Sequence, residues 1–297
     1  MAGLDPAISL REARPCPPYR DRRDKPGDDG GNAMPPDLYF ALTLAVKMSV
    51  TAGFVVAATV TAERVGPLIG GLMATLPVGA GPVYVFLALD HDSHFIAQSA
   101  IASLAINAVN VIFALSYALL AQKRSRAISM SLAFLVWLIL GSVVHSVDWT
   151  FATVGVVNVV VLGISVWLAR PLRHVRVAGF RTRWTDLALR AGLVALLVGV
   201  VVTFSFQLGP GGSGILAVFP VVLISIMFIL HNRVGGPASA AVLANAVLGL
   251  VGFAFACTVL HFSAEALGSA IGLTLALITS VGWSLLVLLA RRHGIAV

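Results

Sequence analysis

Long apolar stretches, separated by short polar turns, dominate the chain from residue 34 onward. A membrane-spanning helix needs about 20 mostly apolar residues, because the hydrocarbon core of a bilayer is about 30 Å thick. Nine stretches meet this requirement: 38–62, 66–89, 95–121, 127–145, 149–169, 187–208, 210–230, 236–260 and 265–290. The pattern predicts an all-α, polytopic membrane helical bundle with about nine transmembrane helices. Counts of eight or ten also fit, because the last stretch is long for one helix and short for two.

Composition supports a membrane protein whose main partner is the lipid bilayer. The 297 residues are 58% hydrophobic and only 11% charged, with a mean hydropathy of +0.94. A soluble domain carries about 25% charged residues. The composition therefore excludes a disordered chain, a disulfide scaffold and an ordinary cytosolic enzyme. The two cysteines, Cys16 and Cys257, suggest neither a disulfide framework nor a metal site.

Residues 1–33 differ from the rest of the chain. They are rich in Pro and Gly and carry six basic and six acidic residues. They lack the apolar stretch of a secretory signal peptide, and their composition cannot form an ordered core. We expect either a disordered leader or an upstream extension of the reading frame, with Met34 as the functional start. Residues 34–297 then form a single membrane domain.

Basic residues are concentrated in every second loop. The loops on one side carry Arg64, Lys123, Arg124, Arg126, Arg170, Arg173, Arg176, Arg181, Arg183, Arg233, Arg291 and Arg292. The loops on the other side carry Asp37, Asp90, Asp92, Asp148 and Glu265. Lys and Arg in short loops mark the cytoplasmic side of a membrane protein. The net charge of +7 is therefore interpreted as loop bias and not as a nucleic-acid footprint. We expect a multi-pass protein of the inner (plasma) membrane, with the N-terminus outside and the C-terminus in the cytoplasm.

Two segments of the chain resemble each other. Residues 44–78 align without gaps on residues 187–221, and the spacing from a Gly-Pro pair to Pro77 returns before Pro220. Five helices separate the two starts, so the second copy would be inverted in the membrane. The predicted inverted repeats cover residues 38–169 and 187–290. A parallel duplication with a miscounted span, or no duplication at all, also remains open.

The two prolines are expected to interrupt helices near the centre of the membrane. Each lies eleven residues after a Gly, which is about 16 Å along a helix. A Pro inside a helix frees a backbone carbonyl, and at membrane depth such a group persists only inside protein or facing a cavity. Pro77 and Pro220 are therefore predicted to border a solute site. Ordinary helix packing is the alternative, because Pro and Gly are common in membrane helices.

Asparagines are expected close to the same depth. Asn107 and Asn245 occupy equivalent positions in the two segments, and Asn110 lies one turn from Asn107. An amide offers both hydrogen-bond donors and an acceptor, so these three side chains are predicted to bind a polar solute. Hydrogen bonds between helices are the alternative. Asn158 has no counterpart and is expected only to pack.

A few ionisable residues are also candidates. Lys47 is the one basic residue after the leader that is expected away from the basic loops, and an ionisable residue inside the membrane is by default a functional candidate. Snorkelling of Lys47 to the surface is the alternative. The run Asp90 to His94, like the pair His145 and Asp148, could hold a divalent metal. The spacing matches no strong metal signature, so no metal and no cofactor are predicted.

Several enzyme signatures are missing from the sequence: it contains no phosphate-cradling loop, no HExxH and no GxSxG with aligned partners. We therefore predict no enzyme but a secondary transporter, a permease that moves a small solute through a midplane site between inverted repeats. The predicted site residues are Lys47, Pro77, Asn107, Asn110, Pro220 and Asn245. The alternatives are a membrane scaffold or accessory subunit without transport activity, and a membrane-embedded enzyme with an outer-face Asp/His site. No nucleic-acid partner is expected, and association of the chain with itself remains open.

Overall fold

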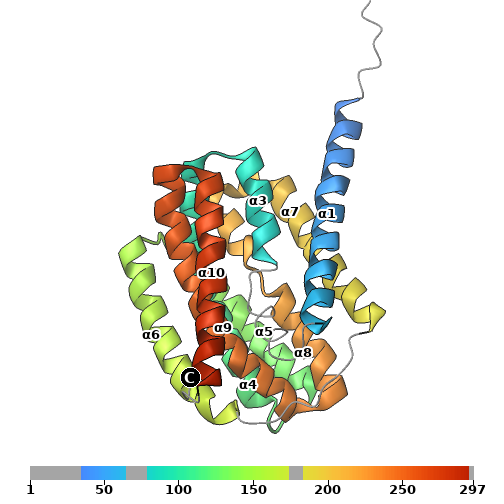
Figure 1. The fold of residues 1–297 in the computed structure, drawn as a ribbon, viewed down its shortest axis with the longest axis vertical. Helices are drawn as coiled ribbons and strands as arrows, with labels where there is room; N and C mark the ends of the chain where they lie inside the picture. Colours follow the sequence, from blue (N-terminus) through green and yellow to red (C-terminus); the bar gives the residue numbers. More distant parts are fainter. Residues whose placement is uncertain (1–34, 65–78, 174–182, 294–297) are drawn as a thin grey trace, which may run out of the picture.

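The computed structural model describes residues 35–64, 79–173 and 183–293, and these residues form a bundle of helices (Figure 1). The helices are α1 (Pro36–Arg64), α3 (Ala80–Asp90), α4 (Ser93–Leu120), α5 (Arg126–His145), α6 (Phe151–Ala169), α7 (Trp184–Ala217), α8 (Val221–Val234), α9 (Gly236–Leu267) and α10 (Ser269–Arg292), with a 3-10 turn at Arg170–Leu172. The all-α fold class is confirmed, since none of the described residues forms a strand. The predicted leader and Pro77 lie outside the described residues.

Local chemistry explains where several helices start. The side chains of Asp92, Ser125 and Thr150 each accept a hydrogen bond from the backbone N–H three residues further on. Such capping oxygens satisfy a donor that the first turn of a helix leaves without a partner. The starts of α4, α5 and α6 therefore lie within two residues of the predicted stretches.

The described residues contain seven helical segments that are long and apolar enough to cross a membrane. One of them, residues 184–234, has 51 residues and would be about 76 Å long as a single helix. The chain reverses at Gly209, where the backbone φ is +63°, and Asp186 near its start is an ion-pair partner of Arg233 near its end. This segment therefore crosses twice, which makes eight crossings among the described residues.

Nine separate spans are not confirmed. α3 has 11 residues, about 16 Å, which is only half of the hydrocarbon core. The remainder of its predicted span lies outside the described residues. The last apolar stretch is resolved as a single helix, α10, because its first residues belong to the end of α9.

Large apolar side chains cover the outside of the bundle. Val159, Phe206 and Leu89 are 74%, 73% and 72% exposed, and many other exposed apolar side chains lie on α1, α5, α6 and α10. A soluble protein rarely exposes such continuous apolar surface. The fold is therefore that of a multi-pass membrane protein whose outer helices face lipid.

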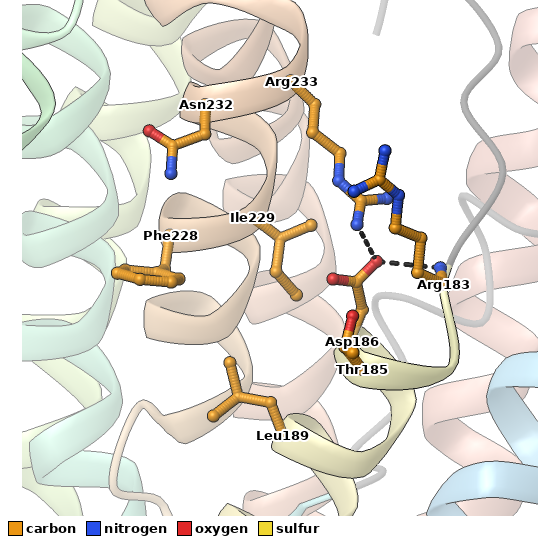
Figure 2. A pocket seen from close by; sticks show the side chains of 8 residues that line it. All are labelled: Arg183, Thr185, Asp186, Leu189, Phe228, Ile229, Asn232 and Arg233. Carbon is orange, nitrogen blue, oxygen red and sulfur yellow. Dashed lines mark hydrogen bonds and ion pairs between the residues drawn. The ribbon is translucent and has the colours of Figure 1, made fainter.

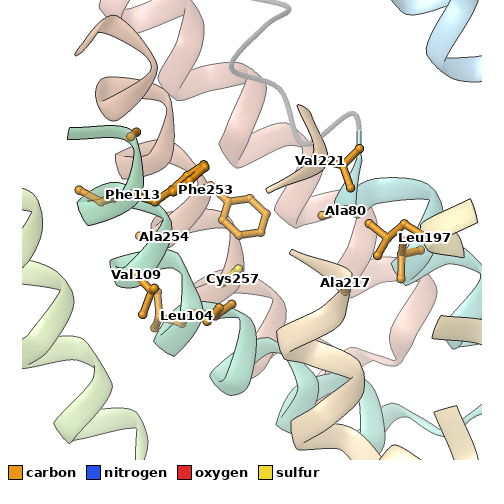
Figure 3. Close-up of a cluster of buried hydrophobic side chains, with 14 of the residues drawn as sticks. Ala80, Leu104, Val109, Phe113, Leu197, Ala217, Val221, Phe253, Ala254 and Cys257 are labelled. Atoms are coloured by element: carbon orange, nitrogen blue, oxygen red, sulfur yellow. The ribbon is translucent and has the colours of Figure 1, made fainter. Parts of the chain in front are cut away.

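α4 lies at the centre of the bundle. It packs against α5, α6, α7 and α9, whereas α1 packs mainly against α7; α1 and α6 lie on opposite flanks (Figure 1). Figure 3 shows Phe113 of α4 beside Phe253 of α9, and Leu104 of α4 near Cys257 of α9, in the apolar core. A helix that is apolar on all sides is stable only when it is surrounded by protein or lipid. The polar side chains of α4 are therefore the ones whose partners need explanation.

The two ends of the bundle differ in charge. At one end, which we call the acidic end, α3 finishes with Asp90, and His94 at the start of α4 contacts Glu265 near the end of α9 at 3.1 Å. At the other, which we call the basic end, Arg233 lies 2.5 Å from Asp186, and Arg291 donates to Asn245 at 2.6 Å. The charge segregation of the loops is thus present in the folded chain.

The predicted inverted repeat is not confirmed and remains a prediction. The described helices have the directions that it requires: α4 runs away from the acidic end while α9 runs toward it, and α1 and α7 are likewise opposed. α3 and α8 are both short, and they end at opposite ends of the bundle. The second segment has only α10 in place of α5 and α6.

Candidate functional site

The second crossing of residues 184–234 starts after Gly209, and its helix is broken at Pro220, as predicted. α7 ends at Ala217, Val218 has non-helical backbone angles (φ −109°, ψ 16°), and α8 starts at Val221. Pro220 has no N–H to donate to the preceding turn, so the helix cannot continue through it. The break lies inside the bundle, beside the apolar core (Figure 3).

Side chains of α4 satisfy the carbonyl groups at this break. The Val218 N–H bonds to the Leu216 carbonyl, so the Gly214 carbonyl lacks the partner that a regular helix would give it. The Ser103 hydroxyl donates to the Gly214 carbonyl at 2.7 Å, and the Asn110 amide donates to the Val218 carbonyl at 2.8 Å. Because unsatisfied backbone groups are costly at membrane depth, these two bonds make the break tolerable.

Three polar residues of α4 contact the broken span and are spaced seven residues apart: Ser103, Asn110 and Tyr117. Tyr117 shares hydrogen bonds with His231 of α8 at 2.8 Å and with Ser239 of α9 at 2.9 Å. Residues seven apart lie on one face of a helix, about 10.5 Å from each other. Sequence reasoning selected Asn110 but missed Ser103 and Tyr117. The spacing of the three residues was the available signal.

Ser103 also connects the break to α3. The Tyr84 hydroxyl lies 2.6 Å from the Ser103 hydroxyl. Because Ser103 donates its single proton to Gly214, Tyr84 must be the donor to Ser103. The resulting chain, from Tyr84 through Ser103 to the Gly214 carbonyl, joins α3, α4 and α7.

α3 and α8 start next to each other. A Cβ atom placed on Gly79 would lie 3.5 Å from Val222 Cγ2, and Figure 3 shows Ala80 close to Val221. From this contact, α3 runs to Asp90 at the acidic end and α8 runs toward the basic end. Two half-length helices therefore begin side by side within the bundle.

Asn107 forms hydrogen bonds between helices. It is fully buried, and its Nδ2 donates to Asn158 Oδ1 and to the Leu250 carbonyl, both at 3.2 Å. Asn158, which was expected only to pack, donates in turn to the Leu104 carbonyl at 2.8 Å. Asn107 Oδ1 finds no hydrogen-bond partner within the part of the chain that the structure describes. Asn107 thereby joins α4 to α6 and α9.

Asn245 has different partners from Asn107. Its Nδ2 donates to the Ala241 carbonyl of its own helix at 2.8 Å, and its Oδ1 accepts a hydrogen bond from Arg291 at 2.6 Å. Asn107 reaches α9 at Leu250 instead, more than one turn away from Asn245. The two predicted counterparts therefore do not bond to a common group, and their role in solute binding remains a prediction.

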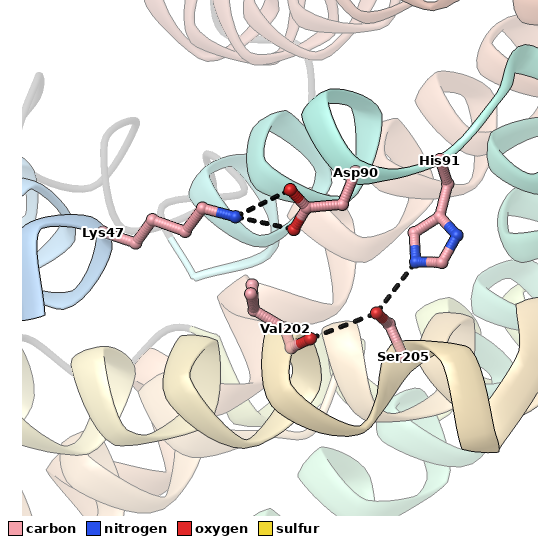
Figure 4. A network of polar contacts seen from close by, with 5 residues as sticks. All are labelled: Lys47, Asp90, His91, Val202 and Ser205. Carbon is pink, nitrogen blue, oxygen red and sulfur yellow. Dashed lines mark hydrogen bonds and ion pairs between the residues drawn. The ribbon is translucent and has the colours of Figure 1, made fainter. Parts of the chain in front are cut away.

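Lys47 is held by an ion pair (Figure 4). Its Nζ lies 2.6 and 2.8 Å from the two carboxylate oxygens of Asp90, and the side chains are only 12% and 25% exposed. The Phe86 ring lies 5.7 Å from the same Nζ. The sequence prediction placed Asp90 in a loop and assigned no partner to Lys47. The fold corrects this, because it brings the last residue of α3 against the first half of α1.

His91 follows this pair and contacts α7 (Figure 4). Its Nε2 lies 2.8 Å from the Ser205 hydroxyl, which donates to the Val202 carbonyl at 3.1 Å. We therefore assign the Nε2–H tautomer to His91. Burial lowers the pKa of His91 below its usual 6.5, and the neighbouring Asp90 and Asp92 carboxylates only partly offset this. His91 is consequently neutral near pH 7.

The acidic and histidine residues of this end have separate partners. Asp90 pairs with Lys47, Asp92 caps α4, and His94 contacts Glu265. Within residues 35–64, 79–173 and 183–293, no group of three or more His, Cys, Asp or Glu side chains could hold a metal ion. The arrangement gives no support to the metal that the enzyme alternative invoked.

Comparison with known proteins does not assign this chain to a family. Comparisons with protein-family models, with curated proteins and with solved structures found no match to this chain. Its function is therefore inferred from the geometry of the bundle.

Proposed function

We propose that this chain is a secondary transporter, a permease that moves a small solute through the centre of the helical bundle. One observation carries the proposal: α3 and α8 begin side by side, where the span before α8 is broken at Pro220. A bundle that only anchors a protein in lipid needs no such break. Discontinuous helices that meet inside a bundle are the usual setting of solute sites in transporters.

The proposed pathway passes between two inverted segments, residues 38–169 and 187–290. The opposed directions of α1 and α7, and of α4 and α9, support this arrangement. One segment would then rock against the other around the break, so that the site opens to each side in turn. Of the predicted site residues, Asn110 and Pro220 lie at the break, and Lys47 lies toward the acidic end.

The proposed orientation puts the basic end in the cytoplasm. The cluster of arginines at the ends of α6, α8 and α10 supports it, because short cytoplasmic loops are enriched in Lys and Arg. The N-terminus would then lie outside and the C-terminus inside the inner membrane.

Cysteine labelling tests alternating access without knowledge of the solute. Cys16→Ser and Cys257→Ala provide a cysteine-free background, and Val222→Cys places one thiol at the start of α8. We expect a membrane-impermeant maleimide to label this thiol both in right-side-out and in inside-out vesicles. Val159→Cys, at a lipid-facing position that is 74% exposed in the protein, is the matched control and should stay unlabelled in both.

Labelling of Val222→Cys from neither side, or from one side only, would contradict alternating access. Once a transported solute is found by screening, replacement of Asn107, Asn245 or Pro77 should abolish its transport while the protein is still expressed. Normal transport in all three variants would show that the site lies elsewhere in the bundle.

One observation favours the alternative of an accessory subunit. Asn107 and Asn110 are buried and already hydrogen-bonded to other helices, as they would be in a bundle without a solute path. A purified complex with one fixed partner, together with a Val222→Cys thiol that is never labelled, would support this alternative.

A further inference from the structure

A cavity of about 730 Å³ lies at the basic end, between the start of α7 and the end of α8 (Figure 2). Its polar lining includes Arg183, Asp186 and Arg233, and its apolar lining includes Leu189, Phe228 and Ile229. Figure 2 shows the guanidinium groups of Arg183 and Arg233 next to each other, with Leu189 and Phe228 further from them. The cavity is thus polar on one side and apolar on the other.

The charged side of the cavity is positive. Asp186 is the one carboxylate among its lining residues, and it accepts both from Arg233 at 2.5 Å and from the Arg183 backbone N–H at 2.9 Å. Arg126 adds a further cation, since its guanidinium lies 4.5 Å from the centre of the Phe228 ring. The lining residues themselves carry two guanidinium groups and one carboxylate, and this excess of positive charge favours an anion.

The apolar side of the cavity continues onto the lipid-facing surface. Leu189 and Phe228 are 39% and 44% exposed, and both belong to the helices that form the twice-crossing segment. A free anion in water would gain nothing from this wall. A molecule with a charged head and an apolar tail would contact both sides at once.

We propose that this cavity binds an anionic phospholipid of the leaflet at the basic end. Its headgroup phosphate would lie against Arg183 and Arg233, and an acyl chain would lie along Leu189 and Phe228. Basic pockets between transmembrane helices on the cytoplasmic side bind anionic headgroups in this manner. The bound lipid connects the two ends of the twice-crossing segment and so stabilises it. This inference needs the membrane location of the chain but not its transport activity.

Lipid binding to the full-length protein in a neutral detergent tests the proposal. The delipidated protein is titrated with dioleoylphosphatidylglycerol or with dioleoylphosphatidylcholine, and bound lipid is counted by native mass spectrometry while the melting temperature is followed. We expect tighter binding and stabilisation with the anionic lipid. Arg183→Gln should weaken this binding about fivefold, the usual effect of one basic side chain at an anionic surface. Leu189→Trp should weaken it by filling the apolar wall.

The control is Arg292→Gln, which removes the same charge from the exposed end of α10, outside the cavity. It should leave binding unchanged. Equal binding of the two lipids, or an equal loss in Arg292→Gln and Arg183→Gln, would overturn the proposal. Binding of glycerol phosphate or inorganic phosphate as tight as that of the lipid would also overturn it, since the site would then serve a free anion.

Discussion

The Ser103 hydroxyl donates a hydrogen bond to the Gly214 carbonyl across 111 residues of sequence, at a distance of 2.7 Å. This bond satisfies a carbonyl that the break before α8 leaves without its helical partner. α4 therefore does more than fill the centre of the bundle, because its polar side chains make an interrupted helix stable at membrane depth. Ser103 and Asn110, both buried on the most buried helix, supply these hydrogen bonds.

Ser103→Ala should lower stability. The change leaves the Gly214 carbonyl without its partner and the Tyr84 hydroxyl without its acceptor, which costs about 1–3 kcal/mol for a buried group. Thermal unfolding in detergent at a fixed heating rate measures the effect. Ser142→Ala is the matched control, because that hydroxyl is exposed and bonds only within its own helix. An equal shift in both variants would mean that the Ser103 bond contributes nothing specific.

Gly214→Ala should disrupt the contact between α7 and α4. A methyl group at this position would overlap the Ser99 carbonyl oxygen, which belongs to the backbone and cannot move away without shifting the helix. We expect a large loss of folded protein in size-exclusion chromatography. Gly211→Ala, three residues earlier and with open space around its Cβ position, should be neutral or slightly stabilising. A normally folded Gly214→Ala protein would contradict the close approach.

Lys47→Met should destabilise the protein by about 1–3 kcal/mol, because it leaves the part-buried Asp90 carboxylate without its cation. The exchanged pair, Lys47→Asp with Asp90→Lys, should recover part of this loss, and a double-mutant cycle measures the coupling. Glu265→Gln is the control, since the His94–Glu265 pair is 66% and 55% exposed and should contribute less than about 1 kcal/mol. A coupling energy of zero would show that α1 is held by its apolar contacts alone.

His91 should make stability depend on pH. Burial lowers the pKa of His91 in the folded protein, while the unfolded chain has the ordinary value of about 6.5. Between the two values the unfolded chain binds more protons, so stability rises with pH through this window and is lost as pH falls below about 6.5. His91→Gln should reduce the slope of melting temperature against pH, and His145→Gln, at an exposed position, should not. An unchanged slope in His91→Gln would assign the pH dependence to other groups.

Hydropathy and helix chemistry alone determined the class of protein and most of its helices. The stretch predicted at 127–145 is the helix α5 at Arg126–His145. A segment that crosses lipid must be a helix of about 20 consecutive apolar residues, and such a run can be recognised in the sequence. The break at Pro220 was also predictable, because the missing N–H is a property of that residue itself.

Only the tertiary structure decided which polar groups meet. Lys47 pairs with Asp90, 43 residues away, and Asn107 bonds to Asn158 and to α9 at Leu250, not beside Asn245. A buried donor that finds no acceptor lowers stability, but periodicity shows only the face on which a side chain lies. The identity of the partner depends on which helices pack together and at what height, and the apolar contacts of the whole chain determine both.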